Sequence, residues 1–332
     1  MSPLATDQLQ VLRFDQIGQD DVLTCGGKGA SLGELSAIGV QVPAGYVVTT
    51  HAFREALAAV DRDGAMVAAI ERLDGDDLDA VRAATARIRD RFERAPLPRQ
   101  LRTEIGRMYA ELCCSAVQEW LPVAVRSSAT GEDSAEANFA GPQDTYLWIR
   151  GENRVVDAVR RCWASLYTVD SVAYRRRRSL PEDGLAMAVV VQRMVDARSS
   201  GVMLTRSPLN GDHSVVAVEA SWGLGSAVVG GAVTPDSFTV DKVTGDVIRR
   251  TIADKRVRDV PVEDGTGVRT EPVPDSLRTV PAVDDGELRR LVELARKTEA
   301  HYGCPQDLEW AISASAPEGE NVFLLQSRPE AV

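Results

Sequence analysis

Long apolar runs are missing from this 332-residue sequence, and none approaches the roughly 20 residues that a membrane-spanning helix needs. Residues 1–10 have neither a basic start nor an apolar core, which argues against a secretory signal peptide. Basic residues are in deficit as well, because 38 Lys and Arg stand against 49 Asp and Glu, giving a net charge of −11. This balance argues against nucleic-acid binding as the main activity.

Cysteine and histidine are also scarce. The five cysteines form no CxxC pair and no metal-ligand spacing with the three histidines, so we interpret them as reduced thiols of a cytoplasmic protein. The one concentration of positive charge is the run 175–178, four consecutive arginines, which we predict to be a solvated helix end.

The pattern of the remaining residues predicts two lobes. Helical periodicity dominates residues 51–120, whereas strand-like runs dominate the chain after residue 185. The Pro- and Gly-containing segment 180–184 separates the two regimes, which predicts an N-terminal lobe at 1–184 and a C-terminal lobe at 185–332. A helix-rich first lobe followed by a mostly antiparallel second lobe indicates an α+β fold.

Two short stretches near the C-terminus, 307–310 and 326–329, are predicted to be the strands of a hairpin closed by the loop 313–321. Since strand side chains alternate between faces, Asp307 and Glu309 share one face, and Gln326 and Arg328 share one face beside Leu324. Closing the hairpin can put two carboxylates, an amide and a guanidinium on one surface. Such a set suits Mg²⁺ and phosphoryl oxygens.

Upstream motifs offer partners for that surface, each with a plainer alternative. Residues 26–29 (Gly-Gly-Lys-Gly) open a helix and are either a phosphate-binding loop or a glycine-rich helix start with a surface lysine. Arg126 ends a strand, and it either clamps a phosphate or pairs with a nearby acid. Gln192 follows an apolar strand, and it either bonds an adenine edge or reaches water. Residues 139–145 form either a ligand-approach loop or a plain turn.

Taken together, these motifs resemble one family, the N-terminal nucleotide-binding module of phosphoenolpyruvate synthase, pyruvate phosphate dikinase and rifampicin phosphotransferase. The resemblance runs from about residue 13 to the end of the chain and keeps the order of the motifs. The matching segments are 26–35 (GGKGASLGEL), 42–46 (VPAGY), 125–133 (VRSSATGED), 139–147 (FAGPQDTYL), 307–310 (DLEW) and 326–329 (QSRP). Pro142 and Asn138 depart from the expected glutamine and serine.

The resemblance implies a two-lobed ATP-grasp fold with ATP and Mg²⁺ as cofactors, and it gives each matching residue a role. The residues implied to contact ATP are Lys28, Arg126, Gly141, Thr145, Gln192, Glu309, Gln326 and Arg328. Those implied to hold the metal are Glu309, Gln326 and Asp307, and those implied to act in catalysis are Arg328, Arg126 and Lys28.

The resemblance also implies a reaction in which the β-phosphate of ATP passes to a histidine on a mobile domain. That histidine lies in a Gly-Gly-x-x-x-His-Ala-Ala-like segment, and neither His51, His213 nor His301 has such surroundings. The chain stops four residues after Arg328. We therefore expect either a fragment of a longer chain or, as the leading hypothesis, the ATP-binding subunit of a split enzyme. A separate polypeptide would then carry the histidine and the site for a small-molecule acceptor, either pyruvate-like or alcohol- or phenol-like.

Two other classes of function stay open. The chain could be a non-catalytic, nucleotide-sensing regulatory subunit, although the intact set of polar residues argues against loss of catalysis. It could also be an ATP-grasp ligase that activates a carboxylate, because a fold does not fix a function.

Overall fold

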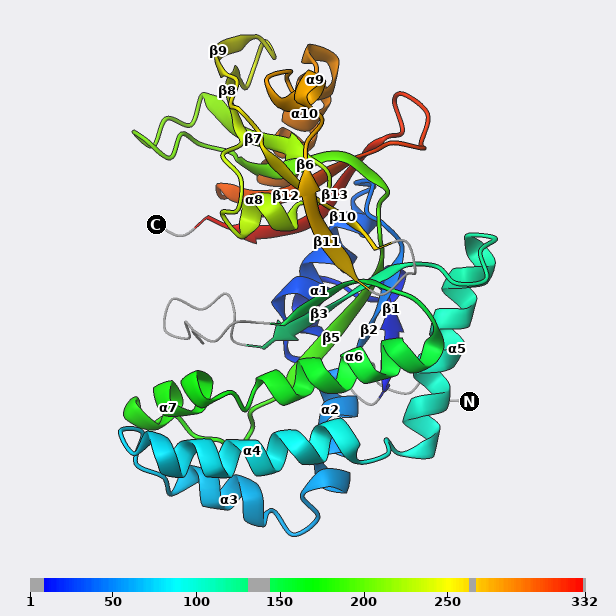
Figure 1. Ribbon diagram of the computed structural model, residues 1–332, viewed down its shortest axis with the longest axis vertical. Helices are drawn as coiled ribbons and strands as arrows, with labels where there is room; N and C mark the ends of the chain where they lie inside the picture. Colours follow the sequence, from blue (N-terminus) through cyan, green and yellow to red (C-terminus); the bar gives the residue numbers. More distant parts are fainter. Residues whose placement is uncertain (1–8, 131–143, 263–266, 331–332) are drawn as a thin grey trace. The chain divides into compact units, whose positions relative to one another are not determined.

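The computed structural model describes residues 9–130, 144–262 and 267–330, and the chain divides into two compact units (Figure 1). The first unit comprises residues 1–34 and 44–194, and the second comprises residues 35–43 and 195–332. No helix in the described part of the chain combines the length and hydropathy of a membrane span.

A five-stranded antiparallel sheet forms the centre of the first unit. Its strands, in the order in which they pair, are β1 (Val11–Arg13), β2 (Gly45–Val48), β5 (Met187–Arg193), β3 (Val123–Ala129) and β4 (Thr145–Ile149). Valines 123, 125, 189 and 191 are fully buried on one face of this sheet, within the main core of the unit. The opposite face is therefore the one that the polar residues of β3 and β5 can occupy.

Helices cover the core face of the first sheet in successive layers. They are α2 (Thr50–Val60), α3 (Ala65–Glu71), α4 (Leu78–Arg94), α5 (Arg99–Ser115), α6 (Glu152–Ser165) and α7 (Val169–Arg177). Of these, α6 packs against β3, β4 and β5, α4 packs on α6, and α3 on α4 (Figure 1). Helix α1 (Val22–Ala37) instead lies on the opposite face, where the Gly29 amide donates to Ser128 Oγ.

The arginine run corrects one prediction. Arg175 is not solvated: it is 1% exposed, and its Nε and Nη2 donate to the two carboxylate oxygens of Glu182, each at 3.0 Å. Arg176 also pairs with Glu182, at 3.1 Å. The carboxylate seven residues beyond Arg175 comes back over the end of α7 and neutralises the buried charge, a contact that helix periodicity does not reveal.

The second unit contains a six-stranded antiparallel sheet. Its strands, in pairing order, are β13 (Val322–Pro329), β12 (Gln306–Ser313), β6 (Ala197–Leu204), β7 (Val215–Trp222), β8 (Asp236–Asp241) and β9 (Val247–Thr251). A separate hairpin pairs β10 (Val257–Pro261) with β11 (Val268–Pro272). The helices are the short α8 (Ser226–Val229) and α9 (Asp275–Arg278) and the long α10 (Asp285–Tyr302).

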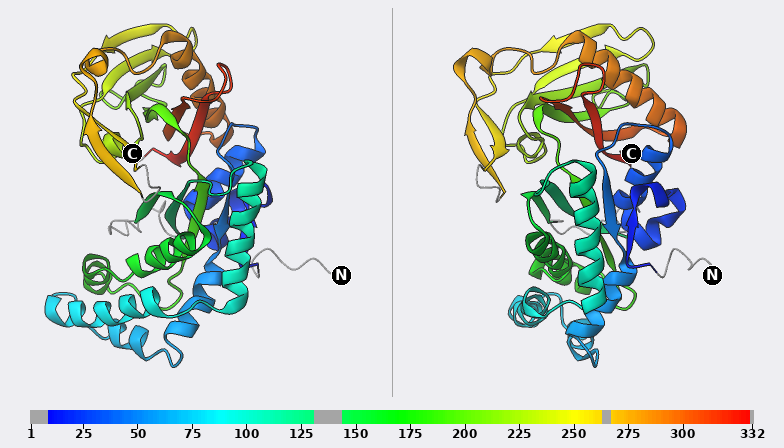
Figure 2. Two further views of the ribbon diagram at one scale, coloured as in Figure 1. Left: turned by 45° about the vertical axis from the view of Figure 1, so that its right-hand side comes forward. Right: turned by 90° about the vertical axis from the view of Figure 1, so that its right-hand side faces the viewer.

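The long helix α10 closes the core of the second unit. Asp284 caps it by accepting from the Glu287 amide at 2.8 Å, Glu287 returns a bond to the Asp284 amide, and Gly303 ends it with φ 68°. Its buried residues pack with the strands in one apolar cluster, and Figure 2 shows α10 (orange) beside the red β12–β13 hairpin. Seven helices before residue 180 and antiparallel sheets throughout the described residues confirm the α+β prediction.

A fully buried ion pair ties three segments of the second unit together. Lys255 Nζ lies 2.6 Å from Asp236 Oδ1, and both side chains are 0% exposed. The carboxylate also accepts from the amides of Ala253 at 2.9 Å and Ala282 at 2.8 Å. Both carboxylate oxygens of Asp236 therefore accept hydrogen bonds, which offsets the cost of burying the two charges.

The two units do not divide where the sequence suggested. The expected lobe boundary follows Gly184, whereas the compact units divide after Met194. The difference is strand β5, which pairs with β2 and β3 and so belongs to the first sheet. Residues 35–43 belong to the second unit although they lie far upstream in the sequence.

Candidate nucleotide-binding site

The glycine loop of the first unit is fixed on the end of β3. Gly26 has φ 69° and ψ 169° and interrupts α1, so the helix starts again beyond it, with Lys28 in its first turn. A Cβ on Gly26 would lie 2.2 Å from the carbonyl oxygen of Ser128, so only glycine fits. The Gly29 amide donates to Ser128 Oγ at 3.1 Å, and Ser128 Oγ–H donates to the Cys25 carbonyl at 2.9 Å. The loop therefore presents Lys28 at a helix N-terminus.

The other predicted residues of the first unit lie on the same face of the sheet. Arg126 pairs in register with Thr145 on β4 and with Val190 on β5, and Gln192 pairs with Ala124. Directly paired strand residues share a face. Ser128, two residues after Arg126, is on this face too and carries the glycine loop. The structure thus brings Arg126, Thr145 and Gln192 to the face on which the loop of Lys28 rests.

The Cys162 thiol lies beside the start of β4, and several groups affect its pKa. Burial raises the pKa of the Cys162 thiol strongly and nearby Asp144 adds to the increase, whereas Lys28 opposes it. Cys162 Sγ lies 3.7 Å from the Asp144 carbonyl oxygen, directly before Thr145. Gly141 and the rest of the predicted approach loop, residues 139–143, lie outside the described residues.

In the second unit the terminal hairpin forms as predicted. Its first strand ends at Ser313, and its second strand begins at Val322. Asp307 pairs in register with Arg328, and Glu309 pairs with Gln326, so the four side chains occupy a two-by-two block on one face. Arg328 Nε and Nη2 both donate to Asp307 Oδ2, at 2.9 and 2.6 Å. These four residues line a pocket of about 550 Å³ that belongs wholly to the second unit.

A β-bulge corrects the predicted position of Leu324. The register of β12 and β13 shifts between Glu309 and Trp310, so that Trp310 pairs with Leu324, and both are 0% exposed in the core. Simple alternation puts Leu324 on the face of Gln326 and Arg328. The extra residue in β13, Leu325, reverses the parity beyond the bulge and returns Leu324 to the core.

The pocket extends across the sheet to residues that the sequence analysis missed. Glu309 pairs with Val202 on β6, Val202 pairs with Glu219 on β7, and Glu219 pairs with Ser237 on β8. All four line the pocket. One signal was available, because Glu219 is the single charged residue in the mostly apolar strand Val215–Trp222.

The donor set of the hairpin fits a hard cation. Asp307, Glu309 and Gln326 offer carboxylate and amide oxygens on adjacent strands, which is the chemistry that Mg²⁺ prefers. One oxygen of Asp307 already accepts two bonds from Arg328, so Glu309 and Gln326 fit best. Among the described residues, no group of three or more His, Cys, Asp or Glu side chains is arranged to hold a metal ion.

Comparison with known proteins identifies relatives over nearly the whole chain. The chain is 43% identical over 316 residues to a probable phosphoenolpyruvate synthase of Methanothermobacter thermautotrophicus, covering 95% of this chain and 45% of the relative. It is 39% identical over 353 residues to a probable phosphoenolpyruvate synthase of Staphylothermus marinus, covering all of this chain and 42% of the relative. It is 43% identical over 305 residues to a rifampicin phosphotransferase of a Streptomyces species, covering 92% of this chain and 34% of the relative.

The chain therefore spans less than half the length of these relatives. Their names confirm the resemblance that the motifs indicated. Residues 22–332 match the family described as pyruvate phosphate dikinase, AMP/ATP-binding domain, and the chain belongs to this family.

Proposed function

We propose that the chain binds MgATP and acts as the nucleotide-binding part of a dikinase-type phosphotransferase. The β-phosphoryl group of ATP would pass to a histidine on a partner polypeptide in the cytoplasm, and AMP would be released. The γ-phosphoryl group would be transferred to water and leave as phosphate. The partner would then phosphorylate a small molecule, pyruvate-like or alcohol- or phenol-like. The observation that carries the proposal is the block of Asp307, Glu309, Gln326 and Arg328 on a pocket wall, in a chain of this family.

Each unit contributes its own part to the proposed chemistry. Lys28, at a helix N-terminus, and Arg126 would bind phosphate oxygens, and the Thr145 hydroxyl and the Gly141 amide would add hydrogen bonds. Gln192 would hold the base. In the second unit, Arg328 would stabilise charge that develops on the transferring phosphoryl group.

Glu309 and Gln326, with Asp307 beside them, would hold Mg²⁺, which neutralises phosphate charge when bound. Asp307 has a second task, because it orients Arg328 through two hydrogen bonds to one oxygen. A guanidinium held in this way needs little reorganisation when a phosphoryl group arrives, and preorganisation of this kind lowers the barrier to transfer.

The test supplies the histidine from a known relative. The chain is incubated with ATP radiolabelled in the β-phosphate and with the full-length Methanothermobacter relative, whose own ATP domain is disabled at the lysine and arginine matching Lys28 and Arg126. We expect label on the relative's histidine and equimolar AMP and phosphate. Stoichiometric ADP would contradict the proposal, and ADP that depends on an added carboxylic acid would identify a ligase.

A regulatory role makes a different prediction for the same assay. A nucleotide sensor would bind MgATP without labelling the histidine, and Arg328→Ala would then change nothing. The proposal requires Arg328→Ala to abolish labelling while calorimetry still detects ATP binding. Arg256→Ala removes an exposed arginine of the same unit that pairs with Asp254, and it serves as the matched control.

A further inference from the structure

A set of polar side chains, three buried and one half-buried, lies directly behind the Asp307–Arg328 pair. We call Thr205, Glu299, Gln306 and Ser327 the hairpin-end network. Gln306 and Thr205 are 0% exposed, and Ser327 is 4% exposed. Gln306 immediately precedes Asp307, and Ser327 immediately precedes Arg328. Because neighbours in a strand point to opposite faces, the network occupies the face opposite the pocket.

A side-chain bond joins the two strands at the open end of the hairpin. Gln306 is paired in register with Pro329, and the Gln306 backbone bonds towards Thr205 at the end of β6, because its carbonyl accepts from the Thr205 amide at 3.0 Å. The Asp307–Arg328 pair is next to this position and is far from the connecting loop that starts after Ser313. Here Ser327 Oγ–H donates to Gln306 Oε1 at 2.7 Å and links β13 to β12.

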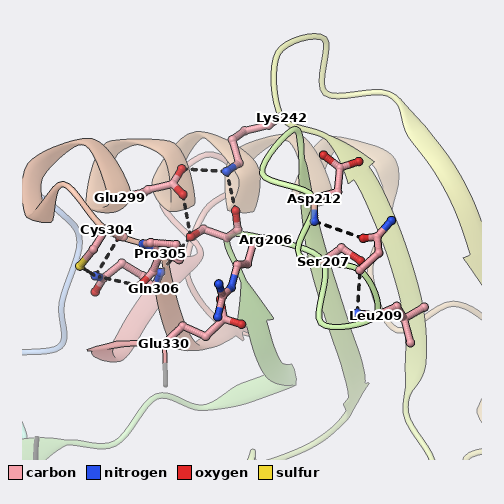
Figure 3. A network of polar contacts seen from close by, with 12 residues as sticks. Arg206, Ser207, Leu209, Asp212, Lys242, Glu299, Cys304, Pro305, Gln306 and Glu330 are labelled. Atoms are coloured by element: carbon pink, nitrogen blue, oxygen red, sulfur yellow. Dashed lines mark hydrogen bonds and ion pairs between the residues drawn. The ribbon is translucent and has the colours of Figure 1, made fainter. Parts of the chain in front are cut away.

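The amide of Gln306 is fixed at its other end as well. Its Nε2 donates to the carbonyl oxygen of Cys304 and to its sulfur, both at 3.1 Å, and lies 3.3 Å from the Pro305 carbonyl oxygen (Figure 3). Oxygen and nitrogen of the amide are thus both engaged. A buried amide satisfied on both sides has one orientation, so the Ser327 hydroxyl is held in place.

The network continues from the hairpin to β6 and to α10. The Gln306 amide N–H donates to Thr205 Oγ1 at 2.8 Å, and Thr205 Oγ1–H donates to Glu299 Oε1 at 3.0 Å. Lys242 Nζ donates to the other oxygen of Glu299 at 2.8 Å, and Figure 3 shows this contact. The start of β12 is therefore anchored to the long helix of the unit.

We propose that Gln306 and Ser327 are positioning residues that set the spacing of Asp307 and Arg328 for the β- and γ-phosphates of MgATP. This inference rests on the proposed function. Neither side chain lies on the pocket face, so both would act through their sequence neighbours. Displacements well below an ångström at such a site matter, since phosphoryl transfer depends on positioning.

The test compares nucleotides that do and do not reach the hairpin. Affinities of the full chain for MgATP, for ATP in EDTA and for AMP are measured by calorimetry. We define the magnesium-dependent gain as the ratio of the affinity for MgATP to the affinity for ATP in EDTA. For Ser327→Ala we expect this gain to fall about fivefold, which is the effect of losing one buried hydrogen bond. AMP, which lacks the β- and γ-phosphates, should bind within about twofold of the unmodified protein. Gln306→Met should behave like Ser327→Ala, and Ser327→Thr, which keeps the hydroxyl, should restore the gain.

A matched control separates positioning from stability. Ser200 is 1% exposed on β6 of the same sheet, and its hydroxyl donates to the Gly223 carbonyl at 2.6 Å. Ser200→Ala loses a comparable bond, so its thermal midpoint should fall similarly while the magnesium-dependent gain stays unchanged. An unchanged gain in both Ser327→Ala and Gln306→Met would overturn the inference alone. No MgATP binding by the unmodified chain would overturn the proposed function, and this inference with it.

Discussion

The two units bring polar residues to a sheet face by different routes. In the first unit, Lys28, Arg126, Thr145 and Gln192 come from α1, β3, β4 and β5, and they share a face only because the strands pair in the order β2-β5-β3-β4. In the second unit, the four hairpin residues come from two strands joined by one loop. A local hairpin can thus build its block of four side chains, whereas the set in the first unit depends on the assembly of an entire sheet.

The largest expected effect contrasts the two arginines. Arg328→Ala should lower AMP formation with the histidine-bearing relative by about 10³-fold or more, because a transition-state arginine is worth that much in phosphoryl transfer. Its effect on the affinity for ATP should be small. Arg126→Ala should chiefly weaken ATP binding, because we assign it to ground-state phosphate contacts. Steady-state kinetics measures the rate of AMP formation, and calorimetry measures the affinity for ATP. If the two variants lost rate and affinity to the same extent, the contrast between the arginines would be contradicted.

Stability of the second unit depends on a buried charge, which a single substitution can leave unpaired. Asp236→Asn keeps one acceptor oxygen but leaves Lys255 without its counter-charge. We expect a loss of about 4 kcal/mol in the free energy of unfolding, typical of a broken buried ion pair. Urea denaturation measures it. Asp254→Asn breaks the more exposed pair with Arg278 and should change stability little. A similar loss in both variants would show that burial of the pair is not decisive.

The first unit should be sensitive at its glycine loop. Gly26→Ala introduces a methyl group 2.2 Å from the Ser128 carbonyl oxygen at φ 69°, so we expect a loss of about 3 kcal/mol from strain and overpacking. Gly64 has nearly the same φ, 68°, with nothing near its missing Cβ. Gly64→Ala therefore isolates the cost of the backbone conformation, about 1 kcal/mol. A denaturant titration measures the free energy of unfolding of each variant. Equal losses in the two variants would mean that the close contact of Gly26 with Ser128 on β3 does not contribute to the loss.

The smallest effect concerns alkaline pH. Burial, with a further contribution from Asp21, raises the pKa of the Cys25 thiol from 9.0 to about 12. The folded state then holds a proton that the unfolded state releases above pH 9, so stability should fall as pH rises from 9 towards 12. Cys25→Ala should flatten this decline by up to about 1.4 kcal/mol per pH unit. Urea titrations at pH 8, 9 and 10 measure it, with exposed Cys114→Ala as the control. Parallel curves for all three proteins would contradict it.

The sequence was most informative where contacts are local. Strand alternation placed Asp307, Glu309, Gln326 and Arg328 on one surface, and the register agrees. Alternation failed at Leu324, because a bulge is a one-residue irregularity that leaves no mark in the pattern of apolar residues.

Predictions that needed distant contacts were less complete. The partner of Arg175 is Glu182, and nothing in helical periodicity indicates that the chain turns back at that point. Strand β5 looked like the start of the second lobe because it follows a Pro- and Gly-containing segment, yet its pairing with β2 and β3 is fixed by residues more than 50 positions upstream. The roles assigned to Lys28, Arg126, Gln192 and the hairpin residues stay predictions until nucleotide binding is measured.

The early segment 35–43 has a practical consequence for anyone who would dissect this protein. Leu35 and Val40 are buried in the apolar cluster of the second unit, and the Gln41 carbonyl accepts from the Leu324 amide at 3.0 Å. A fragment cut at residue 195 would lack this strip, so its core would be open and one β13 amide would lose its acceptor. Producing the second unit alone therefore calls for a rearranged gene, in which codons 35–43 are joined ahead of codon 195 through a flexible linker.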